Sequence, residues 1–406
     1  MSSQVPSAFQ AALARGLISR RTAIVGMAGV TGVAALAACG SAGTGSSGGA
    51  TSQNLVKAAT DLSATEKVVN WSNWPSYMDV DEKTKKHPTL DAFNKETGIK
   101  VNYTEDYNDN SEFYAKVRPL LAAGKDTGRD LWVSTDWMAA RFVRQNYVQK
   151  LDLGNIPNHD NVEDALLNVP WDKGRLYSLP WQSGMTGIAW NPKSTGGKKV
   201  ESMDQLLTDP ALKGKVTLLT EMPDTIGLVL IAMGKDPAAF TDADFDAAIA
   251  ELQKAKDAGQ IKGFTGNDYT KPLASGDTAA CMAWSGDIVQ LKADNPTLGF
   301  ALPQKGFMIW SDNLLIPNLA KHKKNAETLI NYYYDPKVMA EVVDYVNYVS
   351  PVKGTKALLL ESDPAVASNE LILPTPETLA RSHIFRGLNA AEETRYNRKF
   401  EQVVTG

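Results

Sequence analysis

The sequence has few cysteines, few histidines and no excess of basic residues, and each scarcity narrows the possible functions. Its 406 residues include two cysteines and four histidines. Cys39 follows an apolar N-terminal run and Cys281 lies in an expected buried strand, so no disulfide framework is expected. Lys and Arg total 42 against 46 Asp and Glu, giving a net charge of -4. We therefore expect no nucleic-acid partner, because nucleic-acid-binding proteins carry a strong basic surface.

Sequence motifs of enzymes are also scarce. The Gly-Lys pairs at positions 124 and 214 lack a following Ser or Thr, so neither of them is a phosphate-binding P-loop. The histidines lack the spacing of a zinc site. Residues 45–49 match a hydrolase nucleophile elbow in form only, because they lie in a Gly/Ser-rich stretch. We expect a protein that is not an enzyme and needs no cofactor or metal, although catalytic residues meet in space and not along the sequence.

The N-terminus has the features of a bacterial export signal. Arg20 and Arg21 precede an uncharged apolar stretch, residues 22–38, which ends in Leu-Ala-Ala before Cys39. This order is typical of a lipoprotein signal, and Ser-Arg-Arg resembles a twin-arginine export signal. The alternative is an uncleaved anchor, for which the run is short because a spanning helix needs about 20 residues. We expect residues 1–38 to be removed and lipid on Cys39 to hold the protein at the outer face of the cytoplasmic membrane.

The rest of the chain predicts a tether followed by an α/β protein. Residues 39–66 begin with a Gly/Ser-rich stretch that is typical of a flexible tether. From Lys67 onward, short β-rich runs alternate with helical stretches, which predicts two lobes of doubly wound α/β type. The predicted strands are residues 68–71, 99–104, 130–134, 187–190, 215–219, 278–284 and 299–302. The predicted helices are residues 88–97, 111–123, 226–233 and 243–258.

Aromatic residues are concentrated where strands are expected to end. The default ligand site of two α/β lobes is the crevice between them, at the carboxyl ends of the strands. Four of the nine tryptophans, Trp74, Trp137, Trp284 and Trp310, fall at such junctions. Any one of them could instead be a core residue. Together with a carboxylate they indicate a cage for an amine, because each ring face attracts a cation by about 0.5 to 2 kcal/mol and an aspartate neutralises it.

An ordered set of motifs is similar to a known family. These motifs are Asn73-Trp74 with Tyr77, Phe93 to Val101, Asp130-Leu131, Lys213-Gly214 before Leu218-Leu219-Thr220, Met282 to Gly286, and Trp310 to Pro317. In this order, from Lys67 to Val404, the sequence resembles the spermidine/putrescine-binding proteins of bacterial ABC importers. The resemblance implies a two-lobe periplasmic-binding-protein-like fold with the ligand cleft between the lobes. Lobe 1 would hold residues 67–183 and 309–357, and lobe 2 would hold residues 184–308 and 358–406.

The resemblance also implies a mode of action and roles for single residues. Closure of the lobes over a small amine would present a monomeric receptor to the permease subunits of the importer. Asp312 matches the carboxylate that contacts a ligand ammonium, Thr135 stands beside the ligand, and Trp310-x-Asp312 is the most discriminating match. The aromatic ligand wall would consist of Trp74, Tyr77, Trp137, Trp284, Trp310 and Tyr348.

The sequence departs from the family pattern mainly at acidic positions. Ser76 stands where an acid is expected, and the acids after the 215–219 strand are replaced by displaced neighbours, Glu221 and Asp224. The sequence thus keeps few of the family's carboxylates at their own positions, and whether Glu221 and Asp224 turn inward stays open. Arg386 replaces a glutamine, and three alternatives stay open: it binds a ligand carboxylate, it is turned outward, or it is paired with Glu221 or Asp224. Besides a polyamine, an amino-acid-like zwitterion and a sugar stay open as ligands, because tryptophans also stack on sugars.

Overall fold

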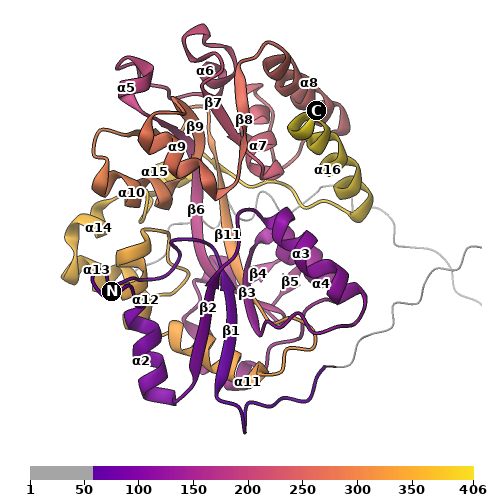
Figure 1. Cartoon of the computed structure of the whole chain (residues 1–406), viewed down its shortest axis with the longest axis vertical. Coiled ribbons are helices and arrows are strands. Elements are labelled where there is room, and N and C mark those ends of the chain that lie inside the picture. Colours follow the sequence, from indigo (N-terminus) through magenta and orange to yellow (C-terminus); the bar gives the residue numbers. More distant parts are fainter. Residues whose placement is uncertain (1–57) are drawn as a thin grey trace, which may run out of the picture.

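The computed structural model describes residues 58–406, in which two α/β halves share one mixed β-sheet (Figure 1). The strand order is β2-β1-β3-β11-β6-β9-β7-β8, with β10 beside β6, β12 beside β11, and a separate β4–β5 ribbon. The strands are β1 (Val68–Asn73), β2 (Lys100–Glu105), β3 (Leu131–Thr135), β4 (Asn168–Val169), β5 (Asp172–Lys173), β6 (Ser178–Trp190), β7 (Val216–Leu219), β8 (Ile261–Thr265), β9 (Ala280–Trp284), β10 (Gly299–Ala301), β11 (Phe307–Leu315) and β12 (Ser382–His383).

Helices flank the sheet in both halves. We call the half with β1, β2, β3, α2, α3, α4 and α11 the lower half, and the half with β7, β8, β9, α5 to α8 and α16 the upper half (Figure 1). The helices are α2 (Pro88–Thr97), α3 (Asn110–Ala122), α4 (Asp136–Arg144), α5 (Pro192–Thr195), α6 (Met203–Thr208), α7 (Met222–Ala232), α8 (Asp242–Asp257), α9 (Thr270–Ser275), α10 (Ser285–Asp294), α11 (Lys323–Tyr333), α12 (Pro336–Val346), α13 (Thr355–Ser362), α14 (Pro364–Ser368), α15 (Pro376–Leu379) and α16 (Ala390–Thr405). Within residues 58–406, none of these helices combines the length and the apolar character that a bilayer crossing requires.

Two long central strands connect the halves. β6 pairs with β11 from Ser178 to Thr186 and with β9 from Thr186 to Trp190, and every one of its residues is buried. β11 pairs with β3 below and with β12 above. Between the halves, the Ser183 and Ser311 hydroxyls lie 2.6 Å apart, and the backbone of Ser183 exchanges two hydrogen bonds with Val349. The halves are therefore joined by the middle of these strands.

The α/β fold class predicted from the sequence is confirmed, and each predicted strand and helix has a counterpart. The helix predicted at 226–233 begins earlier in the structure, at Met222. β11 was not predicted as a strand, because Ser311, Asp312 and Asn313 interrupt the apolar pattern that marks one. Consequently, Trp310 and Asp312 lie in the middle of a strand and not at its end.

The upper half shows how local sequence fixes one helix. α8 begins with a capping box, in which the Thr241 hydroxyl accepts from the Asp244 amide and the Asp244 carboxylate accepts from the Thr241 amide. Its apolar face buries Phe245 and Leu252. Phe245 stacks on Tyr396 of α16 with ring centroids 3.9 Å apart. This contact fastens the C-terminal helix to the upper half.

Candidate ligand-binding site

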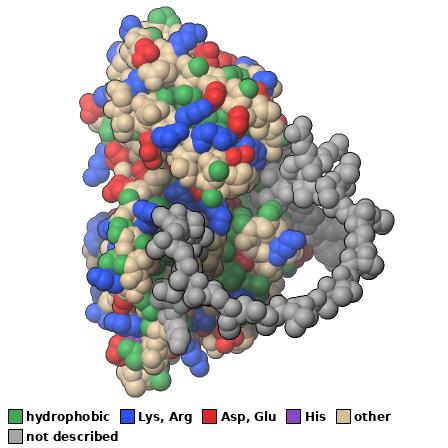
Figure 2. All heavy atoms as spheres, turned by 90° about the vertical axis from the view of Figure 1, so that its right-hand side faces the viewer, with side chains coloured by type: hydrophobic (Ala, Val, Ile, Leu, Met, Phe, Trp, Pro, Cys, Tyr) green, Lys and Arg blue, Asp and Glu red, His purple; other side chains and the backbone are tan. Residues whose placement is uncertain are grey.

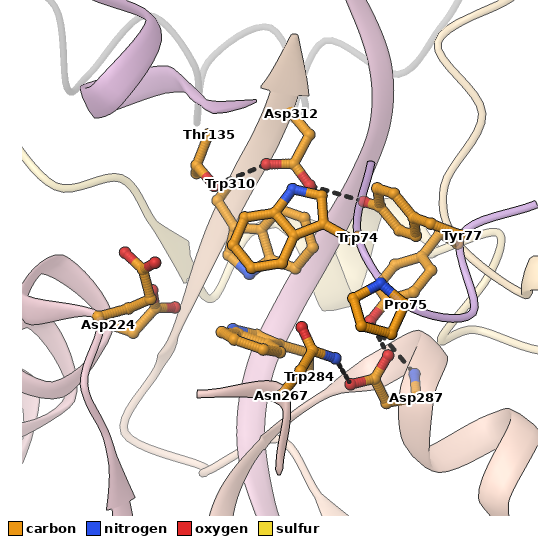
Figure 3. A pocket seen from close by; sticks show the side chains of 12 residues that line it. Trp74, Pro75, Tyr77, Thr135, Asp224, Asn267, Trp284, Asp287, Trp310 and Asp312 are labelled. Carbon is orange, nitrogen blue, oxygen red and sulfur yellow. Dashed lines mark hydrogen bonds between the residues drawn. The ribbon is translucent and has the colours of Figure 1, made fainter. Parts of the chain in front are cut away.

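A pocket lies between the halves and contains about 360 Å³ of space, part of which is open to solvent (Figure 3). Its lining residues are Trp74, Pro75, Tyr77, Thr135, Glu221, Asp224, Asn267, Trp284, Asp287, Trp310, Asp312 and Tyr348. Four of them are carboxylates and five are tryptophan or tyrosine, whereas none of these described lining residues is lysine, arginine or histidine. The pocket is therefore aromatic and acidic.

The aromatic side chains form a continuous wall of tilted and edge-to-face rings. Trp284 lies between Trp74 and Trp310, with centroid distances of 6.1 and 6.3 Å. Trp310 is 5.7 Å from Tyr348, which is 5.0 Å from Tyr77. Such angles keep part of each ring face free of its neighbour, and these faces attract cations.

Two glycines make room for this wall. A Cβ atom at position 184 would lie 2.5 Å from the Trp310 ring, and one at position 286 would lie 2.3 Å from the Tyr348 ring. Both distances are too short for any side chain, so Gly184 and Gly286 allow the rings to pack against the backbone. Gly286 ends the sequence motif that begins at Met282, which gives this part of the motif a steric reason.

Asp312 reaches the pocket from the middle of β11, where this strand pairs with β3. The register places Asp312 opposite Thr135, whose hydroxyl donates to Asp312 Oδ1 at 2.6 Å. The Tyr77 hydroxyl donates to Oδ2 at 2.8 Å. Burial raises the pKa of Asp312 to about 7, although both hydrogen bonds oppose this shift. The site thus holds a desolvated carboxylate whose partners are neutral.

Asp287 is a second lining carboxylate, and the sequence analysis missed it. It lies in the first turn of α10, where Tyr348 donates to Oδ1 at 2.7 Å and Tyr269 donates to Oδ2 at 2.8 Å. Asn267 donates to Oδ2 at 3.1 Å. Burial raises the pKa of Asp287 to about 6. A signal was present in the sequence, because Asp287 directly follows the Met282 to Gly286 motif.

The two acids at the start of α7 both face the pocket. Asp224 accepts from the Thr186 hydroxyl, which in turn accepts from the Trp310 indole at 3.1 Å, and burial raises its pKa to about 6. Glu221 accepts from the Asn110 amide nitrogen at 2.7 Å. Burial, followed by the charge of nearby Asp109, raises the pKa of Glu221 to about 8. The three acids named from the sequence, Glu221, Asp224 and Asp312, therefore all line the pocket together with Asp287.

Two residues predicted as ligand contacts lie elsewhere. Trp137 does not line the pocket itself. Its indole nitrogen donates to the lining residue Glu221, at Oε2 and 3.2 Å. Arg386 is paired with Glu392, at 3.0 and 3.2 Å, and lies over the Phe240 ring with its Cζ 4.3 Å from the centroid. The prediction that Arg386 lies in the cleft is therefore wrong. Glu392 and the Phe240 ring satisfy its charge outside the pocket. Cys39 lies outside the described residues.

The chemistry of the pocket suits an organic cation better than a metal. Within residues 58–406, no group of three or more His, Cys, Asp and Glu side chains is arranged to hold a metal ion. The four pocket carboxylates are instead spread among aromatic rings and hydroxyl donors. Figure 3 shows three of them, Asp224, Asp287 and Asp312, well apart from one another. Spaced acids and aromatic rings that line one pocket can neutralise and surround ammonium groups.

Comparisons with known proteins agree with this fold. Residues 88–374 match the family of bacterial extracellular solute-binding proteins. The spermidine/putrescine-binding periplasmic protein of Escherichia coli K12 is 28% identical over 317 residues, which cover 78% of this chain and 88% of that protein. The spermidine/putrescine-binding periplasmic protein 1 of Haemophilus influenzae is 30% identical over 297 residues, covering 72% and 79%.

Solved structures are also similar in fold. The spermidine/putrescine ABC transporter substrate-binding protein PotD of Streptococcus pneumoniae superposes with a TM-score of 0.66 at 23% identity, over 83% of this chain and 98% of that one. At this identity the likeness concerns the fold. Because the family match spans most of the described residues, the chain belongs to the bacterial extracellular solute-binding proteins.

Proposed function

We propose that this protein captures a polyamine, such as spermidine or putrescine, and delivers it to the permease subunits of an ABC importer. The observation that carries the proposal is the pocket itself, in which four buried carboxylates lie among aromatic rings and none of the described lining residues is basic. The two curated relatives are named for binding spermidine and putrescine. A polyamine supplies several ammonium groups along one chain, which matches several separated acids.

The electrostatics of the pocket favours a polyamine over the other two ligand classes. A zwitterion needs a positive partner for its carboxylate, and Arg386 is held elsewhere by Glu392. A neutral sugar leaves the desolvated acids without charge compensation. A polycation supplies that compensation and also gains cation–π attraction from the rings of Trp74, Trp284 and Trp310.

Delivery to a permease requires a shape change on binding, and the two halves provide the means. We assign residues 67–183 and 309–357 to one lobe and residues 184–308 and 358–406 to the other. β6 and β11 cross between them near the Ser183–Ser311 contact. Bending at this crossing opens and closes the cleft, as in other hinged receptors.

Calorimetric titration of the mature chain without its lipid, residues 40–406, tests the ligand class. We expect spermidine or putrescine to bind with micromolar or higher affinity, about −8 kcal/mol, because the pocket neutralises each ammonium. We expect 4-aminobutyrate and a neutral sugar to give no binding heat at the same concentrations. Heat from either of these without heat from polyamines would overturn the proposal.

We also propose that residues 1–38 are a twin-arginine-type export signal and that lipid on Cys39 anchors the mature protein at the outer face of the cytoplasmic membrane. The support is the order of basic, apolar and small residues before Cys39. In cells given a labelled fatty acid, Cys39→Ala is expected to lose the label and to leave the membrane fraction. Cys281→Ala is the matched control and should retain both. A labelled Cys39→Ala protein would contradict lipidation at this cysteine.

A further inference from the structure

An ion-pair cluster of Arg141, Arg144 and Glu393 joins the two halves outside the pocket, and two of its members, Arg141 and Glu393, are buried. Glu393 lies in the first turn of α16, on the upper half, and is 8% exposed. Arg141 and Arg144 lie on α4, in the lower half. Arg141 Nε donates to Glu393 Oε1 at 2.6 Å, and the Arg144 guanidinium donates to Glu393 Oε2. Each oxygen of a single upper-half carboxylate is therefore bound by an arginine of the lower half.

Arg141 connects this cluster to the pocket. Its guanidinium lies over the Trp137 ring, with Cζ 5.1 Å from the centroid, and over the Tyr114 ring at 4.9 Å. The Trp137 indole nitrogen then donates to Glu221 Oε2 at 3.2 Å. A continuous set of contacts thus runs from Glu393 through Arg141 and Trp137 to the pocket wall, and it passes from the upper half to the lower half and back.

Glu221 is held by the lower half on both of its oxygens. Oε1 accepts from the Asn110 backbone at 2.7 Å and from the Asn110 side chain at 2.9 Å, in addition to the Trp137 bond on Oε2. A neighbouring contact, from the Thr220 hydroxyl to Asp109 Oδ2 at 3.0 Å, crosses between the same halves. Glu221 therefore forms a cross-half contact besides lining the pocket.

We propose that Arg141, Arg144 and Glu393 form an inter-lobe latch that holds the cleft closed, and that Trp137 and Glu221 couple this latch to occupancy of the pocket. The proposal rests on the proposed function, because closure retains a ligand. Opening of the cleft separates Glu393 from both arginines, whereas a bound ligand keeps the halves together. The latch slows ligand release, and Glu221 acts in closure while Asp224, Asp287 and Asp312 face the ligand.

Other ion pairs of α16 provide a matched control. Lys399 pairs with Asp246, and Arg395 with Asp242, so both join α16 to α8 within the upper half. Breaking either pair removes an ion pair of α16 without touching the contact between halves. Figure 2 shows basic and acidic side chains together on this side of the upper half. Asp246→Asn is therefore expected to leave ligand release unchanged.

The test measures spermidine dissociation by stopped flow for the mature chain and its variants. We expect Glu393→Gln and Arg141→Gln each to release spermidine roughly tenfold faster, because interface changes act mainly on dissociation. The double variant should release spermidine only a little faster than either single variant, since both substitutions break the same Arg141–Glu393 ion pair. Unchanged release rates in the Glu393 and Arg141 variants, or the same acceleration in Asp246→Asn, would overturn the latch.

A second measurement separates the latch from the identity of the ligand. Spin labels on cysteines introduced at the exposed positions Lys125 and Lys254 report the distance between the halves, while buried Cys281 stays unlabelled. Glu393→Gln is expected to shift the ligand-free distances toward the open form. If wild-type protein does not bind spermidine, the polyamine proposal fails while this shift still supports the latch. Identical distances together with identical release rates would exclude it.

Discussion

Asp312→Ala is expected to weaken spermidine binding by at least about 2 kcal/mol, roughly 30-fold, because it leaves an ammonium buried without its charge partner. The substitution also leaves the Tyr77 and Thr135 hydroxyls, which both donate to Asp312, without their acceptor. Titration calorimetry of wild type and variant under one set of conditions measures the difference. Asp277→Asn, which removes an exposed carboxylate, controls for net charge and should bind as wild type does.

The melting temperature of an Asp312 variant tells whether this residue serves ligand binding or the stability of the fold. Burial raises the pKa of Asp312 to about 7, so its carboxyl binds a proton more tightly in the folded protein than in the unfolded chain. The proton on Asp312 therefore stabilises the folded protein at low pH, and this contribution is lost as the pH rises through that pKa. At neutral pH we expect the isosteric Asp312→Asn variant without ligand to melt no lower than wild type. A lower melting temperature, or wild-type affinity in Asp312→Ala, would contradict the assigned role.

Much of this architecture follows from local sequence, because periodicity and helix caps are read over a few residues. Strands β1, β2 and β3 and helix α2 were predicted within a few residues of their observed bounds. Strand β11 was not predicted, because the middle of its sequence is polar. Its conformation is imposed by pairing with β3 and β6, which are distant in sequence, so no pattern within β11 itself indicates a strand.

The same contrast separates the site residues that were predicted from those that were not. Trp74, Trp284 and Asp312 were found because motifs carry them, and Asp287 was missed although one motif ends beside it. Arg386 was misplaced because an alignment position does not show which neighbours a flexible side chain reaches. Its partner, Glu392, is also the capping-box glutamate of α16, so the start of a helix decides where the arginine lies.

The pocket carboxylates link affinity to pH, and the sign of this link follows from their environment. Burial raises the pKa of Asp312 to about 7 and the pKa values of Asp224 and Asp287 to about 6. An ammonium favours the ionised form of each acid and so lowers these pKa values, which means that binding releases protons. Acidification through this range therefore opposes binding of a cation, while amines stay protonated throughout.

Spermidine affinity is accordingly expected to fall on the order of 100-fold between about pH 8 and about pH 5.5, because three acids must lose protons before they pair with ammonium groups. Calorimetry across this range measures the fall, and repeating each titration in buffers of different ionisation enthalpy counts the protons released. Asp312→Asn lacks the carboxyl with the highest pKa of these three, so its profile should be flatter and its proton release smaller. An affinity that stays constant, or that increases on acidification, would mean that these carboxyls do not pair with the ligand.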